Sequence, residues 1–345
     1  MKSIQFHLFK TLLIIALIAP VSLEAGFNPF GWLSSDGNKD QQNKIITTLE
    51  VQEVKANKLL TNAERYASKG KVRREQKIYK KILKKYHKTE AAEAIALKRG
   101  EYLFKKNKWV DAFSALTALT MNHPSSSSLE AAIELQYQCA DSLMKFVPRK
   151  TLGIFKSDPL NDKAIPLFLS FVNFYPYDAR APQALLNVAD IAQTNGQNEV
   201  AIVALKQIIN GYSDSALTSD AYFKIAHIYA DFIKGPEYDL ESTREAIRYC
   251  EDYIALFSTS SDIGSIKALY ERMLNTLATN RLYMADYYYF NRRDNVAALI
   301  FYNEAITLAP DSQAALEARS RLDAIERGVK PTTGRNLIKK ILFIR

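Results

Sequence analysis

The sequence predicts an all-α protein, built as a solenoid of about five to six helical hairpins. Glycine (12 residues) and proline (11 residues) are sparse in a chain of 345, which favours helices over turn-rich sheets. Alanines and large side chains recur at helical spacing, and turn-forming stretches return at a fixed interval, as in a repeat protein. No alternation of polar and apolar residues competes with this interpretation.

The clearest repeat is the stretch "LYMADYYYFNRRDNVAALIFYNEAITLAPD" at 282–311. It follows the tetratricopeptide pattern W-x2-L-G-x2-Y…A-x3-F…P, in which small residues let two antiparallel helices approach and an aromatic fills the space beside them. Asp286 departs from the pattern, because glycine normally holds its position. The matching residues are Leu282, Ala285, Tyr289, Ala298, Tyr302, Ala305 and Pro310.

The aromatic residues of this stretch are core candidates first. Tyr289 and Tyr302 are interpreted as packing between helices rather than as ligand contacts, which is the commoner role of aromatics at helical spacing. Tyr287 and Tyr288 cannot both face the same side as Tyr289. At least one of the two is therefore expected to reach a groove or the solvent, where it is available to a partner.

The same signals divide the rest of the chain. The turn stretches "KGK" (69–71) and "KNK" (106–108) lie 37 residues apart. The pair of alanine and large residue recurs at Ala112/Leu116, Ala164/Phe168, Ala201/Leu205 and Ala246/Cys250. The first unit is degenerate, with Glu75 in the alanine position, and the third contains an insertion at 146–162 that is expected to be a surface loop. Six units result: 50–87, 88–127, 128–177, 178–214, 215–259 and 260–310, with a closing helix to about 327.

The N-terminus has the layout of a secretory signal. Lys2 and Lys10 precede the short apolar run 11–19, and cleavage after Ala25 is expected. No cysteine follows the apolar run, so a lipidated N-terminus is not indicated. We therefore expect an exported, periplasmic protein. The predicted divisions are a signal peptide at 1–25, a linker at 26–49, the solenoid at 50–327 and a tail at 328–345.

No pattern of catalytic or metal-binding residues is present. The four histidines are scattered, and motifs such as HExxH, Cys-x2-Cys and phosphate-binding glycine loops do not occur. We therefore predict neither an enzyme nor a cofactor. Cys139 and Cys250 lie in different units, which argues against a disulfide because units of a solenoid contact only their neighbours. Cys250 holds the large-residue position of its unit and is expected to be buried.

A basic helix is predicted at 71–88, "KVRREQKIYKKILKKYHK". Residues 54–108 contain 18 Lys/Arg and 5 Asp/Glu, whereas the whole chain has a net charge of only +9. One interpretation is the solvated outer face of a terminal repeat. The other is a surface for anionic lipid headgroups or an acidic partner; nucleic acid conflicts with the export signal. The basic surface comprises Arg73, Arg74, Lys77, Lys80, Lys81, Lys84, Lys85 and Lys88.

The tail "KPTTGRNLIKKILFIR" (330–345) is a short basic amphipathic segment. It is either a helix docked on the last repeat or a peptide that contacts a membrane surface or a partner. Exposed apolar ends are otherwise a liability, which favours the second alternative. Its apolar residues include Leu337, Ile338, Ile341, Leu342 and Phe343.

The C-terminal half resembles the BamD (YfiO-type) outer-membrane assembly lipoproteins. Their last repeat reads as a helix with A-x-Y-Y, a short basic turn, an A-A helix and a closing P-D-S. A second similarity lies at 239–261, through Thr243, Ala246, Ile247 and Phe257. The residues that match the last repeat are Ala285, Tyr287, Tyr288, Arg292, Ala297, Ala298, Pro310, Asp311 and Ser312.

This resemblance implies a non-catalytic periplasmic adaptor at the inner face of the outer membrane. In that family the C-terminal repeats hold the barrel-inserting outer-membrane channel protein, and the N-terminal repeats receive unfolded barrel substrates. Carried over, the C-terminal contact maps to Tyr287, Tyr288, Arg292 and Arg293. The lipid-bearing cysteine of the family is missing, so the basic helix or the tail would have to tether the chain. The alternative is a general cell-envelope scaffold for cell-wall or secretion components.

Overall fold

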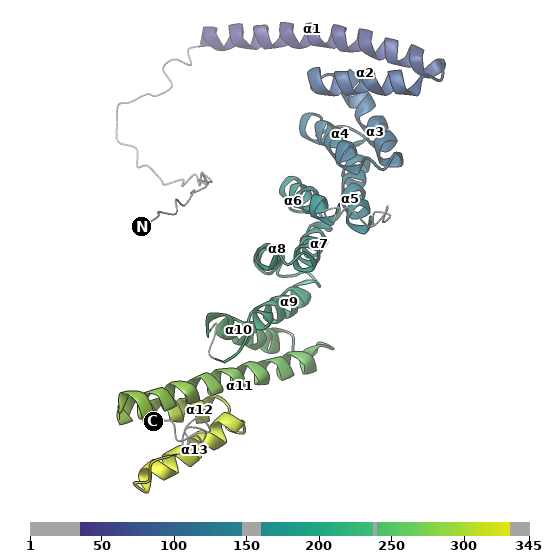
Figure 1. The fold of residues 1–345 in the computed structure, drawn as a ribbon. Helices are drawn as coiled ribbons and strands as arrows, with labels where there is room; N and C mark the ends of the chain where they lie inside the picture. The colour runs from purple at the N-terminus through teal and green to yellow at the C-terminus, as the bar shows by residue number, and fades with distance from the viewer. Residues whose placement is uncertain (1–34, 147–159, 237–239, 332–345) are drawn as a thin grey trace, which may run out of the picture. The chain divides into compact units, whose positions relative to one another are not determined.

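The computed structural model describes residues 35–146, 160–236 and 240–331, and every regular element in these ranges is helical (Figure 1). The chain divides into two units, 1–55 and 56–345, and the helical hairpins belong to the second. The α-helices are α1 (Ser35–Ser68), α2 (Val72–Lys85), α3 (Glu90–Lys105), α4 (Trp109–Asn122), α5 (Leu129–Lys145), α6 (Ala164–Phe174), α7 (Ala181–Thr194), α8 (Asn198–Gly211), α9 (Thr218–Asp231), α10 (Leu240–Leu256), α11 (Ile263–Tyr287), α12 (Asn295–Leu308) and α13 (Gln313–Glu326).

Within the second unit each helix packs against its neighbours in the chain (Figure 1). The hairpins α3–α4, α7–α8, α9–α10 and α11–α12 have the most extensive contacts, and the first helices of successive hairpins also touch, as α3 and α5 do. This is a tetratricopeptide-like solenoid of about six hairpins, so the predicted fold class is confirmed. The predicted closing helix is α13.

The first helix is longer than the sequence analysis predicts. α1 begins at Ser35, so residues 35–49 of the segment interpreted as a linker are helical. Between Ser35 and Ser68 the sequence has no proline and a single glycine, Gly37, so nothing in it breaks the helix.

The core follows the predicted pairs of alanine and large residue. In five hairpins both members of the pair are 0% exposed: Ala112/Leu116, Ala164/Phe168, Ala201/Leu205, Ala246/Cys250 and Ala298/Tyr302. The methyl group of each alanine lets the partner helix come close, and the large side chain fills the space one turn further along. In the degenerate first unit Tyr79 is buried four residues after Glu75, and burial raises the pKa of its hydroxyl to about 12.

A second repeated position explains why Asp286 departs from the tetratricopeptide pattern. Gly100 lies 16 residues before Leu116, and a methyl group added to it would come within 2.5 Å of the Leu116 side chain. Asp286 lies 16 residues before Tyr302, and the Tyr302 hydroxyl donates a 2.7 Å hydrogen bond to its Oδ1. The same carboxylate oxygen lies 2.9 Å from Nε of the buried Arg321 on α13. In the last hairpin a hydrogen bond from Tyr302 and an ion pair with Arg321 therefore replace close packing against glycine.

The turns between hairpins are also repeated. Each begins at the residue that ends the preceding helix, whose carbonyl accepts a hydrogen bond from the amide three residues later. Two of these turns are tied to the turn before them: His123 Nε2 is 2.9 Å from the His87 carbonyl, and the Tyr212 hydroxyl donates to the Pro176 carbonyl at 2.8 Å. The turns begin at Tyr86, His123, Tyr175, Tyr212, Phe257 and Ala309.

The insertion follows α5 in the sequence, and the two cysteines lie on α5 and α10. Most of the insertion at 146–162 lies outside the described residues, and its end forms a short 3-10 helix, η1 (Leu160–Lys163). Cys139 and Cys250 are both buried and free, which agrees with the burial expected for Cys250 and with the argument against a disulfide. Burial raises the pKa of each thiol to about 12.

The contact at Gly100 yields a stability prediction. Gly100→Ala pushes a methyl group into the fully buried Leu116, so we expect the free energy of unfolding to fall by about 1–3 kcal/mol in urea titrations. Gly264→Ala is the matched control, since its methyl group meets nothing within 4 Å. The control should gain about 0.4–1 kcal/mol. Equal effects of the two changes would contradict close packing at Gly100.

Asp286 yields a prediction for the pH dependence of stability. Burial is the main cause that raises its pKa above the usual range. Its contribution to folding is therefore fully present below the unfolded pKa of about 3.9, and it is lost as pH rises through the folded pKa. Relative to Asp286→Asn, the wild type should lose stability as pH rises from about 4 to 7.

Asp178 provides a control of opposite sign. Its hydrogen bonds from Arg180 hold the pKa of the carboxyl below its usual range. Its contribution is present above the unfolded pKa and is lost as pH falls. Relative to Asp178→Asn, the wild type should therefore gain stability as pH rises toward about 5, mostly below the unfolded pKa of about 3.9. The loss relative to Asp286→Asn occurs at higher pH and has the opposite sign. Unfolding free energies measured at several pH values test both, and slopes of the same sign would contradict the assignment.

Candidate interaction surfaces

The turn between α11 and α12 differs from the other hairpin turns. In four hairpins a residue in the left-handed region lies five positions before the alanine position of the core pair, which Glu75 holds in the first of them: Gly70 (φ 65°), Asn107 (φ 57°), Gly196 (φ 73°) and Arg293 (φ 59°). Glycine and asparagine tolerate this conformation, whereas an arginine is disfavoured by its Cβ. Arg293 is thus a strained residue in a position that the repeat assigns to a small one.

The hydrogen bonds of this turn differ as well. In the α1–α2, α3–α4 and α7–α8 hairpins the chain leaves the first helix by the same pair of hydrogen bonds. In the α7–α8 turn, the Gly196 amide donates to the Gln193 carbonyl and the Gln197 amide to the Ala192 carbonyl. α11 instead continues into a π-helix, η2 (Tyr288–Arg292). The amides of Arg293 and Asp294 both donate to the Tyr288 carbonyl. π-Helical turns are rare and occur often at functional sites.

The side chains of this turn form an exposed aromatic and cationic patch, the terminal-turn surface (Tyr287, Tyr288, Arg292 and Arg293). Tyr287 is 41% exposed, and the Arg292 guanidinium lies 5.5 Å from the centre of its ring. Tyr288 is partly buried and stacks on Phe301 with ring centres 5.4 Å apart. Arg292 and Arg293 are exposed, and neither forms an ion pair with any residue that the structure describes.

The tyrosines of the last hairpin differ in how deeply they are buried. Tyr302 is fully buried, as predicted. Tyr289 packs against the terminal core but is only partly buried. Of Tyr287 and Tyr288, the first is the one that reaches the solvent.

An open pocket lies between α11 and α12, further along the hairpin from this turn, with a volume of about 600 Å³. The ion pair of Arg281 and Glu304, 2.9 Å long, crosses it, and Ile300 on its wall is 54% exposed. Val296, one turn before Ile300, is also exposed. Sequence reasoning missed this surface, although "NVAALIFYNEAITL" has apolar residues on every face of α12, more than one neighbouring helix can cover.

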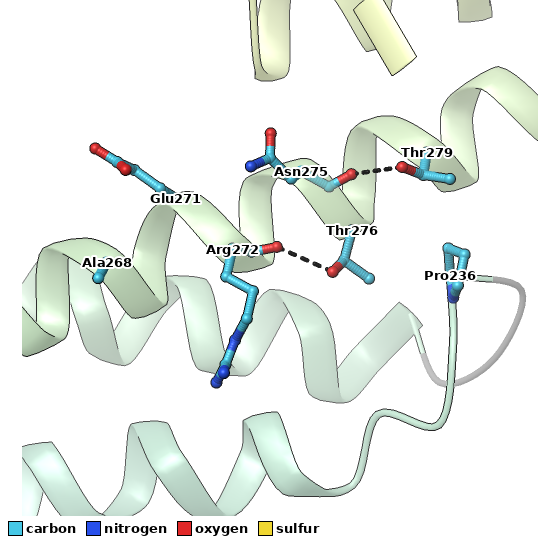
Figure 2. A pocket seen from close by; sticks show the side chains of 7 residues that line it. All are labelled: Pro236, Ala268, Glu271, Arg272, Asn275, Thr276 and Thr279. Carbon is cyan, nitrogen blue, oxygen red and sulfur yellow. Dashed lines mark hydrogen bonds between the residues drawn. The ribbon is translucent and has the colours of Figure 1, made fainter. Parts of the chain in front are cut away.

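A second pocket, of about 430 Å³, lies along α11 (Figure 2). Its hydroxyls are engaged within the helix: Thr276 donates to the Arg272 carbonyl and Thr279 to the Asn275 carbonyl. Pro236 closes one side, held by a 2.8 Å hydrogen bond from Asn280 to its carbonyl.

The basic surface is where the sequence places it. Its eight Lys/Arg residues are all exposed, and none forms an ion pair among the described residues. Tyr79 and Ile82 on the opposite side of α2 are buried against α3. Arg99 of α3 donates a 2.7 Å hydrogen bond to the Gln76 carbonyl, which adds a further cation next to this helix. The cations are thus directed away from the core by the packing of α2.

The two surfaces lie on different hairpins. α2 packs against α3 and α4, whereas η2 packs against α11 and α12. The tail residues predicted to contact a membrane or a partner, 337–343, lie outside the described residues. Where the structure describes the chain, no group of three or more His, Cys, Asp or Glu residues could hold a metal ion. No helix of this part is long and apolar enough to cross a membrane.

These features define a tetratricopeptide-like helical-repeat protein with exposed, unpaired surfaces. No protein-family model and no curated protein matches the sequence. One similar solved structure is described as the crystal structure of MamA protein, with 15% identity over 70% of this chain and 98% of that chain and a TM-score of 0.28. Another is the human IFIT1 dimer with m7Gppp-AAAA, with 14% identity, 82% and 77% coverage and a TM-score of 0.22. Such distant likenesses carry no argument about function.

The strained arginine yields a prediction about stability. Arg293→Gly removes the Cβ that disfavours the left-handed conformation, so we expect the free energy of unfolding to rise by up to about 1 kcal/mol. Arg292→Gly is the control, because Arg292 lies in the π-helix, where glycine should destabilise by about 0.5–1 kcal/mol. Chemical unfolding monitored by circular dichroism measures both. If Arg293→Gly lowers the free energy of unfolding instead, the contacts of the arginine side chain stabilise the fold by more than its backbone strain destabilises it.

Proposed function

We propose that this protein is a non-catalytic, exported scaffold that binds a partner protein through the terminal-turn surface. The observation that carries the proposal is Arg293, a non-glycine residue in the left-handed conformation next to the exposed Tyr287. Backbone strain is retained where the surrounding structure over-determines it, and such positions cluster at binding and active sites. The scaffold class is supported by the fold, since stacked hairpins create long surfaces for other chains.

The turn between α11 and α12 is held in place by its contacts with α12. The Asp294 side chain caps α12 by accepting a hydrogen bond from the Ala297 amide, and Tyr288 is stacked on Phe301. Arginine and tyrosine are the residue types most enriched among the few that dominate binding energy in protein interfaces. A rigid turn also limits the conformational entropy that is lost on binding.

The pocket between α11 and α12 supplies the apolar part of such an interface. Its exposed Ile300 and the neighbouring Val296 can be covered by an apolar side chain of the partner. Cations and aromatics on the same hairpin as exposed apolar side chains resemble the composition of a protein interface, with an apolar centre and a polar rim.

The finer proposal is an adaptor of the outer-membrane protein assembly machinery, periplasmic and peripheral at the outer membrane. The similarity of 285–312 to the last BamD repeat supports it, because exposed residues of the turn are among those that match. The partner would be the barrel-inserting channel protein, with unfolded barrel segments as further cargo. A general cell-envelope scaffold for cell-wall or secretion components is the second candidate, favoured by the missing lipid-bearing cysteine.

Capture of partners from native membranes after mild crosslinking tests these proposals. We expect the wild type to recover the barrel-inserting channel protein and Arg292→Glu/Arg293→Glu to recover at least about tenfold less, because reversed charges repel the partner. Arg244→Glu/Lys267→Glu is the control, with the same charge change at two exposed cations of α10 and α11.

Each remaining outcome has a defined meaning. Equal capture by all three proteins would overturn the role of the terminal-turn surface. Capture of cell-wall or secretion components in place of the channel protein, with the same sensitivity to Arg292 and Arg293, would keep the surface and discard the role in outer-membrane assembly.

A further inference from the structure

A continuous groove runs along α4, between α2 and α6. It consists of two adjoining pockets of about 280 and 480 Å³. Both are lined by Leu83 of α2 and by Ser114 and Ala118 of α4, so one opens into the other. The groove is formed by the second helices of three successive hairpins, and it is separate from the terminal-turn surface.

One end of the groove is cationic. Lys80, Lys84 and Arg99 line it, together with a single acidic residue, Asp111. Arg99 is held in place by hydrogen bonds from its Nη1 to the backbone and side chain of Gln76. Lys80 and Lys84 are exposed and form no ion pair among the described residues, so their ammonium groups are available to a ligand.

The other end of the groove is apolar and accessible. Phe113, Met121 and Phe174 line it with Leu83. Met121 is 63% exposed and Phe174 is 39% exposed, which leaves much of their surface without a partner. Methionine adapts its shape to different apolar ligands, a property of surfaces that bind peptides by packing.

The length of the groove sets the size of its occupant. On α4 it extends from Asp111 to Asn122, a distance of about 16 Å along a helix. This accommodates about three turns of a helix, at a pitch of about 5.4 Å per turn. A peptide segment of this size carries both charged and apolar side chains, as the two ends of the groove require.

Charge decides the chemistry of the occupant. The groove opens beside α2, which carries seven exposed cations, so an acidic ligand is attracted and a basic one is repelled. A flat layer of lipid headgroups reaches cations that protrude from the surface, but it does not fill a hollow with aromatic and methionine walls. Carboxylates and apolar side chains on one segment satisfy both ends of the groove.

We propose that this groove binds an acidic amphipathic segment of another protein, with its carboxylates against Lys80 and Lys84 and an apolar side chain between Met121 and Phe174. Such a segment lays its apolar face into the groove, as amphipathic helices do in other helix-in-groove complexes. The inference adds a second binding surface to the proposed scaffold, and it stands independently because the terminal-turn surface belongs to another hairpin.

The test measures fluorescence anisotropy with a labelled peptide of about 14 residues, long enough to cover the groove as a helix. The peptide has Leu or Phe at every third or fourth position and Glu elsewhere. A second peptide replaces each Glu with Gln. We expect the acidic peptide to bind the wild-type protein at low salt, and the Gln peptide to bind at least about tenfold more weakly. Equal binding of both peptides would overturn the charge complementarity.

The variants separate the groove from the general charge of α2. Lys80→Glu/Lys84→Glu, at the groove, should weaken binding about tenfold or more. Lys81→Glu/Lys85→Glu makes the same change one residue further along the same helix, outside the groove, and should weaken it less than about threefold. Met121→Ser, at a mostly exposed position that tolerates substitution, should also weaken binding. Equal losses from the two lysine pairs would overturn the groove as the site.

Two further arms complete the experiment. Vesicles of phosphatidylcholine and phosphatidylglycerol are sedimented with the protein; binding of vesicles without binding of the acidic peptide would overturn the proposal and assign the face to a lipid surface. Arg292→Glu/Arg293→Glu should bind the acidic peptide as the wild type does. Loss of peptide binding in that variant would overturn the independence of the two surfaces. Circular dichroism and urea midpoints confirm that each variant is folded.

Discussion

The close approach of paired helices is the constraint on which the rest of this structure depends. In five hairpins an alanine allows the approach and a large residue four positions later fills the space, and both are completely buried. Because these side chains interlock, the core of each hairpin fixes which of its surfaces face the neighbouring hairpins. The left-handed turn residue lies five positions before the alanine, so the register of the turn follows from the register of the core.

The terminal hairpin modifies this plan in two connected ways. A carboxylate takes the position of a small residue, and the buried Arg321 and Tyr302 satisfy it. A buried charge of this kind requires its partners, so α13 is tied to α11 by more than apolar contact. On the same helix, one turn further along, α11 widens into a π-helix and ends in a strained arginine. The last hairpin is thus both firmly packed and unusually shaped at its exposed end.

Charge is distributed unevenly along the solenoid, and this distribution separates two kinds of surface. The first hairpins carry a dense set of cations without acidic partners, next to a groove with apolar walls. The last hairpin combines aromatic residues and arginines around a single turn. A scaffold with two chemically different surfaces can bind two different partners, because each surface attracts one class of ligand and repels another.

The sequence by itself determined the helical class, the register of the hairpins, the core pairs and the exposure of the basic face. These follow from periodicity within one helix or one hairpin, where residues three or four positions apart share a face. Only the tertiary structure decided which residues of different hairpins meet. Lys84 and Phe174 belong to helices far apart in the sequence, and they line one groove because α2 and α6 both flank α4. The contact between Asp286 and Arg321 likewise depends on how α13 packs against α11. Contacts of this kind depend on how the hairpins stack, so no local pattern in the sequence indicates them.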